Sequence, residues 1–135
     1  MGTSEQPIDG IKELARSDVG GLRAALRNLG VVVAEADLLL RYVWIDNPHS
    51  DFDPQAVVGK RDDELIAASE AAEIMELKAE VLLEKKALSR VLAFDRSDGA
   101  WYYSLCAFPI IDDDGKIDGI FTIGFPSSRE RWREP

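Results

Sequence analysis

The chain has 135 residues, of which 46% are hydrophobic and 30% charged, so it can fill the core of one compact domain. Its formal net charge of -9 argues against the concentrated basic surface that binding to nucleic acid or to an anionic membrane requires. The single cysteine, Cys106, excludes an intrachain disulfide framework and fits a reducing compartment. No apolar run approaches the ~18 residues of a spanning helix, and residues 1–10 lack the apolar core of a secretory signal. We therefore expect a cytoplasmic protein that does not insert into a membrane.

An amphipathic helix is predicted near the N-terminus. Apolar residues recur at helical spacing between Ile11 and Leu29, and Gly30 supplies a stop. Because an exposed apolar stripe is unfavourable in water, we expect this helix to join two copies of the chain as a homodimer. The alternative, in which the helix only covers its own sheet, stays open.

Two strands joined by a tight turn are predicted next. Residues 31–35 and 38–45 are rich in β-branched and aromatic side chains, and Ala36-Asp37 separates them. Strict alternation along the second strand places Tyr42 and Trp44 on one face. Both side chains are therefore expected to be buried.

Helices are expected in the middle of the chain. Asp53 is a cap for a short helix that starts at Pro54, and a second short turn begins at Asp62. Good helix formers dominate from Ser69 to Lys85 and carry an apolar stripe that includes Met75.

Three strands are predicted after the long helix, at residues 88–94, 100–109 and 117–125. Asp98-Gly99 and Asp114-Gly115 separate them, and Asp-Gly between such runs is a strong hairpin signal. These strands should form an antiparallel meander.

The domain organisation follows from these elements. We expect a polar segment and flanking helix at residues 1–30, one folded domain at 31–126, and the start of a C-terminal helix or a tail at 127–135. Ser127 and Glu130 fit a capping box at that last boundary.

The order of elements predicts an α+β fold, with a five-stranded antiparallel sheet and helices on one face. Between Leu39 and Pro109 the sequence also resembles the PAS family. Residues 41–48 resemble the second strand and following turn of PAS domains in bacterial sensor histidine kinases, and residues 58–65 resemble the family's "GK-x-D-x-E-L" segment. The penultimate strand of the family is matched by Trp101-Tyr102 with Pro109, and the turn into its last strand by residues 115–119.

The resemblance implies a PAS fold and a sensory or signal-transduction domain. Such a domain is the input or relay module of a bacterial sensor histidine kinase or similar regulator, and it binds a small ligand or mediates dimerisation. Catalysis is not expected, since any kinase activity would reside in a separate domain. Two alternatives stay open: a small α+β enzyme or carrier of the ketosteroid-isomerase-like type, and a ligand-free PAS dimerisation scaffold. Phe125-Pro126-Ser127-Ser128 also departs from the Asp-Ile-Thr-type segment that ends many PAS domains.

No cofactor is predicted. Haem-binding PAS domains carry a histidine on the long helix, and residues 69–85 contain none. Flavin-binding photosensors carry a reactive cysteine on a short helix, whereas Cys106 falls in the penultimate strand. His49 with Asp51 and Asp53 lacks a metal-binding spacing. An unidentified small molecule remains as the ligand.

The candidate site is the cavity between sheet and helices, where PAS domains hold small ligands. Aromatic side chains with a polar tip suit a mostly apolar pocket with a few hydrogen bonds. The candidate lining residues are Tyr42, Trp44, Met75, Tyr103 and Leu105. An ordinary packed core would use the same residue types.

Overall fold

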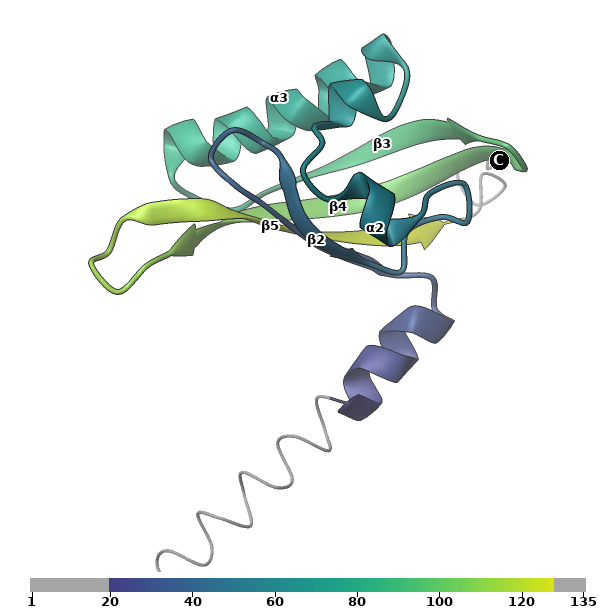
Figure 1. The fold of residues 1–135 in the computed structure, drawn as a ribbon, viewed down its shortest axis with the longest axis horizontal. Helices are drawn as coiled ribbons and strands as arrows, with labels where there is room; N and C mark the ends of the chain where they lie inside the picture. Colours follow the sequence, from purple (N-terminus) through teal and green to yellow (C-terminus); the bar gives the residue numbers. More distant parts are fainter. Residues whose placement is uncertain (1–19, 128–135) are drawn as a thin grey trace, which may run out of the picture.

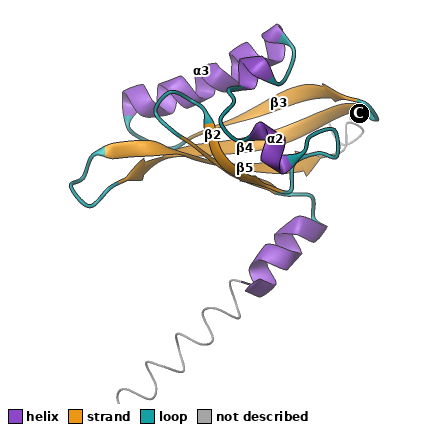
Figure 2. Cartoon of the chain, in the orientation of Figure 1, coloured by secondary structure: helices purple, strands orange, loops and turns teal. Residues whose placement is uncertain are grey.

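A computed structural model describes residues 20–127, which form one antiparallel sheet with helices over one face (Figures 1 and 2). The elements are β1 Val32–Ala36, β2 Tyr42–Asp46, α2 Pro54–Val57, the short 3-10 helix η2 Asp62–Glu64, α3 Ala68–Glu84, β3 Leu88–Arg96, β4 Gly99–Ile111 and β5 Ile117–Ser127. The order across the sheet is β2-β1-β5-β4-β3, with every neighbouring pair antiparallel. The predicted fold class is therefore confirmed. No helix in the described range is long and apolar enough to cross a membrane.

A side-chain cap sets the start of α2, and a left-handed backbone conformation sets the end of α3. Asp53 caps α2 by accepting a hydrogen bond from the backbone N–H of Gln55, and Pro54 takes the first helical position. The long helix α3 ends at Lys85, which adopts a left-handed conformation with φ 59°. Both helices lie where the sequence predicts them.

The two hairpins of the meander follow their Asp-Gly turns. Gly99 has φ 121° and pairs with Arg96 at the β3–β4 turn. At the β4–β5 turn, Asp112 Oδ1 accepts hydrogen bonds from the backbone N–H groups of Asp114 and Lys116, each at 2.9 Å. These turns place β3, β4 and β5 side by side as the floor of the core.

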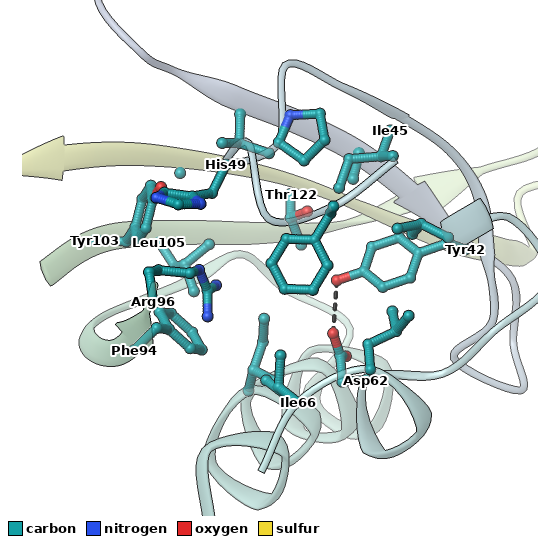
Figure 3. Close-up of a pocket in the computed structure, with 18 residues that line it drawn as sticks. Tyr42, Ile45, His49, Asp62, Ile66, Phe94, Arg96, Tyr103, Leu105 and Thr122 are labelled. Carbon is teal, nitrogen blue, oxygen red and sulfur yellow. Dashed lines mark hydrogen bonds between the residues drawn. The ribbon is translucent and has the colours of Figure 1, made fainter. Parts of the chain in front are cut away.

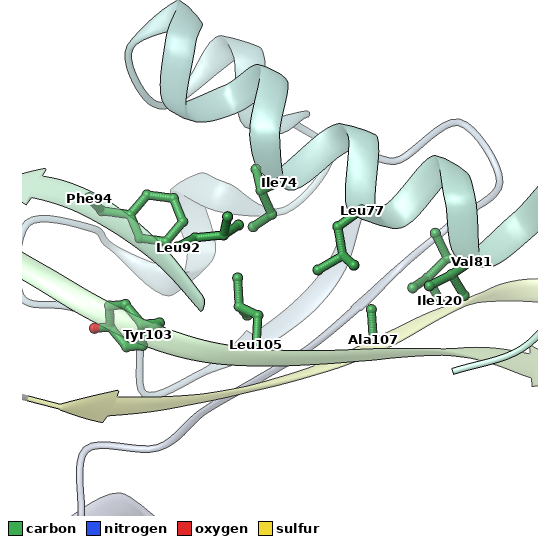
Figure 4. Packing of buried hydrophobic residues seen from close by; sticks show 9 residues of the cluster. All are labelled: Ile74, Leu77, Val81, Leu92, Phe94, Tyr103, Leu105, Ala107 and Ile120. Carbon is green, nitrogen blue, oxygen red and sulfur yellow. The ribbon is translucent and has the colours of Figure 1, made fainter. Parts of the chain in front are cut away.

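The main core lies between α3 and this floor (Figure 4). Ile74, Leu77 and Val81 point from α3 toward the sheet, and Leu77 and Val81 are completely buried. The side chains that meet them are Leu92 and Phe94 of β3, Tyr103, Leu105 and Ala107 of β4, and Ile120 of β5. This packing fixes the height of α3 above the sheet.

The first hairpin differs from its prediction. Strand β2 begins at Tyr42, and Leu38 and Leu39 lie in the preceding turn, exposed to solvent. Asp37 organises this turn, because its Oδ1 accepts hydrogen bonds from the backbone N–H groups of Leu39 and Arg41. Apolar composition alone therefore overestimated the length of the strand.

Residues 20–28 are helical and lie on the side of the sheet opposite α3 (Figure 1). Arg23 and Arg27 both bind the carboxylate of Asp46 at the end of β2; the Arg23 Nη2–Asp46 Oδ1 and Arg27 Nε–Asp46 Oδ2 distances are each 3.1 Å. Hydrogen bonding from Arg27, joined by that from Arg23, lowers the pKa of Asp46 to about 2. Asn47 adds hydrogen bonds to the carbonyl oxygens of Arg27 and Val31. The earlier part of the predicted helix and Glu130 of the predicted C-terminal capping box lie outside the described residues, whereas Ser127 is the last residue of β5.

Candidate functional site

A cavity of about 100 Å³ lies between the sheet and the segments that cross its inner face (Figure 3). Its floor comes from β1, β4 and β5, through residues such as Val32, Leu105 and Thr122. Its remaining walls come from β2, the end of β3, α2, η2, the first turns of α3 and the 47–53 loop. The cavity therefore joins elements from almost the whole fold.

Three of the five residues predicted to line a pocket do line it: Tyr42, Tyr103 and Leu105. Met75 is half-buried and packs against the main core instead of the cavity. Trp44 faces away from the cavity. Whether the lining residues contact a ligand stays a prediction.

The expected burial of Trp44 is wrong because β2 contains a bulge. Glu35 pairs with Trp44 but Ala36 pairs with Tyr42, so β2 holds one extra residue between these pairs. An extra residue moves the side chains on either side of it to opposite faces of the sheet. Trp44 is therefore 37% exposed on the outer face, where its ring meets Phe121 edge to face at 5.9 Å. Its indole Nε1 donates a hydrogen bond to Glu35.

A buried polar network at one end of the cavity joins Tyr42, Asp62 and Lys78. The Tyr42 hydroxyl donates to Asp62 Oδ1 at 2.6 Å, and Lys78 Nζ donates to Asp62 Oδ2 at 2.7 Å and to the Tyr42 hydroxyl at 3.1 Å. The Lys78 side chain is 0% exposed. Burial, reinforced by the Asp62 charge, raises the pKa of Tyr42 well above its usual range. The phenol thus stays a proton donor at neutral pH.

Sequence reasoning missed this network, although one signal was present. Lys78 falls between Ile74 and Val81 on the apolar stripe of α3, where an unpaired ammonium group would be costly. A lysine in that position indicates a buried partner elsewhere in the chain. Asp62 is that partner.

Arg96 brings a second cationic group to the opposite side of the cavity (Figure 3). Its guanidinium carbon lies 4.9 Å from the ring centroids of both Phe52 and Phe94. Among the described residues, its Nε is the one buried side-chain nitrogen or oxygen that lacks a hydrogen-bond partner. The sequence showed no sign of this, because β3 was expected to end at Phe94.

Hydrogen bonds to the β3–β4 turn hold the 47–53 loop over the cavity. His49 Nε2 lies 2.8 Å from Asp98 Oδ1, and His49 Nδ1 accepts a hydrogen bond from the Asp51 backbone N–H. Trp101 Nε1 donates to the same Asp98 oxygen, and this bond is the main cause of the lowered pKa of Asp98. Asp51 in turn accepts hydrogen bonds from the backbone N–H and hydroxyl of Ser97. The loop therefore forms an outer wall held by several polar contacts.

Both ring nitrogens of His49 have hydrogen-bond partners, Asp98 Oδ1 and the Asp51 backbone N–H. The described residues contain no group of three His, Cys, Asp or Glu side chains that could hold a metal ion. Cys106 is half-buried and is not among the residues that line the cavity. A mostly apolar wall with a few polar groups is the arrangement that proteins use to bind small organic molecules.

Comparisons with known proteins agree with this geometry. A family profile described as the PAS fold matches residues 26–131. Histidine kinase 5 of Arabidopsis thaliana is 26% identical over 125 residues, which cover 92% of this chain and 14% of that protein. The chain thus spans only a small part of this curated relative.

Two solved structures have the same fold. A sensory box sensor histidine kinase from Vibrio cholerae superposes with a TM-score of 0.62 at 17% identity, covering 88% of this chain and 98% of that one. VqmA bound to DPO superposes with a TM-score of 0.66 at 19% identity, covering 77% of this chain and 56% of that one. Since the family profile matches most of the sequence, the chain belongs to the PAS family of sensory and signal-transduction domains.

Proposed function

We propose that this PAS domain is the signal-input or relay module of a sensor histidine kinase or similar regulator, and that its cavity holds a small ligand. The observation that carries the proposal is the cavity itself, with a buried guanidinium N–H that has no acceptor. Similarity to histidine kinase 5 and to a solved sensor kinase domain supports the kinase context. The VqmA structure supports ligand binding by this fold, because that protein is bound to DPO.

The cavity wall suggests how occupancy becomes a signal. Its floor belongs to the sheet, whereas the opposing wall includes α2, α3 and the 47–53 loop. A ligand that fits one packing of these parts better than another shifts the balance between them, and only that difference in affinity drives the shift. Catalysis would belong to a separate domain. The absence of haem and flavin, a cytoplasmic location and a bacterial origin also stay predictions.

Filling the cavity should abolish small-molecule binding. Ile66 lines the cavity and is half-buried between η2 and α3, so Ile66→Trp places a large ring in the space. In a thermal-shift screen of chemically diverse fragments, we expect several fragments to raise the melting temperature of the wild type but not of Ile66→Trp. Binding to the native state alone produces such a rise.

Val58→Trp is the matched control, because Val58 is exposed and lies outside the cavity. It should respond to the same fragments as the wild type. If no fragment stabilises the wild type, or if Ile66→Trp responds equally, the cavity is not a ligand site and a ligand-free scaffold is favoured.

A homodimer joined by the N-terminal helix is a second proposal. Leu22 in this helical segment and Leu29 in the turn that ends it are both exposed, seven residues apart, and Arg23 and Arg27 attach the segment to Asp46. Light scattering should give a dimer for the full chain and a monomer for Leu22→Glu/Leu29→Glu. A full chain that stays monomeric at high micromolar concentration would favour a helix that covers only its own sheet.

A further inference from the structure

Arg96 is the charged group of the cavity wall whose partners are incomplete. Its Nη1 donates to the backbone carbonyl of Asp95 at 3.1 Å, whereas its Nε is buried without an acceptor. Within residues 20–127, no carboxylate lies within 4.0 Å of its guanidinium. A buried charged donor without a partner is costly, so an occupant that supplies acceptor oxygens is favoured at this position.

The other ionisable groups on the cavity wall are already matched. Each carboxylate oxygen of Asp62 accepts a hydrogen bond, one from Tyr42 and one from Lys78, and His49 is held between Asp98 and the Asp51 backbone N–H. These groups leave one positive charge at the cavity wall, that of Arg96, without a direct ion pair in residues 20–127, although the Asp51 carboxylate, which is bound to Ser97, attracts it through space. A ligand with one negative charge would neutralise it.

The guanidinium specifies the chemistry of that negative group. Its N–H donors form a planar fork, and a carboxylate accepts two of them with strong, charge-assisted hydrogen bonds. Phe52 and Phe94 flank the guanidinium and keep it in place. Tyr103 also lines the cavity, and its hydroxyl has no hydrogen bond to the described part of the chain. Burial raises the pKa of Tyr103, so its hydroxyl keeps the proton that it can donate.

The remaining wall is apolar and the space is small. Ile45, Ile66 and Leu105 offer hydrocarbon surfaces around about 100 Å³. An apolar cavity of about 150 Å³ accommodates benzene, so this smaller one suits an acid of roughly four or five carbons. We infer that the cavity takes a small monocarboxylic acid, with its carboxylate on Arg96 and its hydrocarbon part against these side chains. The inference rests on the proposed function, since it names the ligand class of the same cavity.

Pairs of acids and amides test the inference directly. Butyrate and valerate are titrated into the full chain by isothermal calorimetry or NMR, beside their neutral isosteres butyramide and valeramide. At least one acid should bind with a Kd of about 1 mM or tighter and at least about tenfold more tightly than its amide. Equal affinities for acid and amide, or no binding of either acid up to about 10 mM, would overturn the inference.

Substitutions of two arginines in β3 test whether the acid binds at Arg96. Arg96→Gln should remove the preference for the acid, and Arg96→Lys should weaken binding of the acid because it loses the planar fork. Arg90→Gln is the control: it removes the same charge from the same strand, but Arg90 pairs with Glu80 outside the cavity. Acid binding that is unchanged in Arg96→Gln would contradict the assignment. Should that variant not fold, Arg96→Lys and the acid–amide comparison on the wild type still decide.

The two proposals fail in different ways. If neutral fragments bind in a manner that Ile66→Trp abolishes but neither acid binds, the cavity is a ligand site of another chemistry. If neither fragments nor acids bind, both the ligand class and the ligand-binding function are wrong.

Discussion

Replacing Asp62 with alanine is expected to lower the free energy of unfolding by about 3 to 5 kcal/mol, because it leaves the Lys78 ammonium buried without a counter-charge. Lys78 is 0% exposed, and its Nζ lies 2.7 Å from Asp62 Oδ2. The Tyr42 hydroxyl would lose its acceptor in the same variant. Urea denaturation followed by circular dichroism measures the loss as a shift in midpoint at constant slope.

The neighbouring residue gives a matched control. Asp63 is exposed and lies 3.5 Å from Arg61, so Asp63→Ala should change stability by no more than about 0.5 kcal/mol. A triple variant, Tyr42→Phe with Asp62→Leu and Lys78→Met, removes every polar group of the network and should be more stable than Asp62→Ala. Equal midpoints for Asp62→Ala and Asp63→Ala would show that the network does not form.

Truncating Leu77 to alanine should cost about 2 to 5 kcal/mol, the range for deleting a fully buried leucine side chain. Leu77 is 0% exposed in the core between α3 and the sheet, so the variant leaves a space that its neighbours fill only in part. The same urea titration measures this loss.

Leu83 makes the comparison specific to burial. It belongs to the same helix but is 81% exposed, and alanine is at least as good a helix former as leucine. Leu83→Ala should therefore stay within about 0.5 kcal/mol of the wild type. If the two variants had equal midpoints, α3 would not pack on the sheet through Leu77.

Local sequence signals predicted most of the fold, because the structures concerned are set by neighbouring residues. Asp53-Pro54 starts a helix through a side-chain cap and a fixed φ, and Asp98-Gly99 closes a hairpin through a positive φ. Such effects act over a few residues and can be recognised without knowing the fold. The order of the elements then predicted the α+β fold, and the resemblance of segments such as residues 41–48 and 58–65 to PAS sequences indicated the family.

The errors arose where pairing between distant segments decides the outcome. The bulge in β2 depends on how Glu35 and Ala36 pair with it, and this register reversed the orientation expected for Trp44 relative to Tyr42. Asp37 likewise holds Leu39 and Arg41 in a turn before β2, because its carboxylate accepts hydrogen bonds from their backbone N–H groups. Alternation within one segment contains no information about either effect.

The site was predictable only in part for a related reason. Tyr103 and Leu105 were found because they alternate along a long, regular strand. Lys78 and Arg96 were missed, because charged residues are normally assigned to the surface unless a partner is known. Asp62 lies 16 residues from Lys78 in the sequence, and only the folded chain brings them together.

Two consecutive residues, Asp46 and Asn47, connect the cavity to the N-terminal helix. They hold that helix through Arg23, Arg27 and the Arg27 carbonyl, and the next residues, Pro48 and His49, line the cavity. A ligand that displaces Pro48 and His49 would therefore also displace Asp46 and Asn47, to which the helix is bound.

Because linkage between two sites is reciprocal, a change at the helix would also affect ligand binding in the cavity. Suppose that a protein segment fixes the helix in one orientation and thereby changes the affinity of the cavity for such a ligand by some factor. The ligand would then change the affinity of the domain for that segment by the same factor. The sensitivity of the domain would consequently be a property of the whole assembly. The domain alone and the domain bound to such a segment are expected to respond at different ligand concentrations.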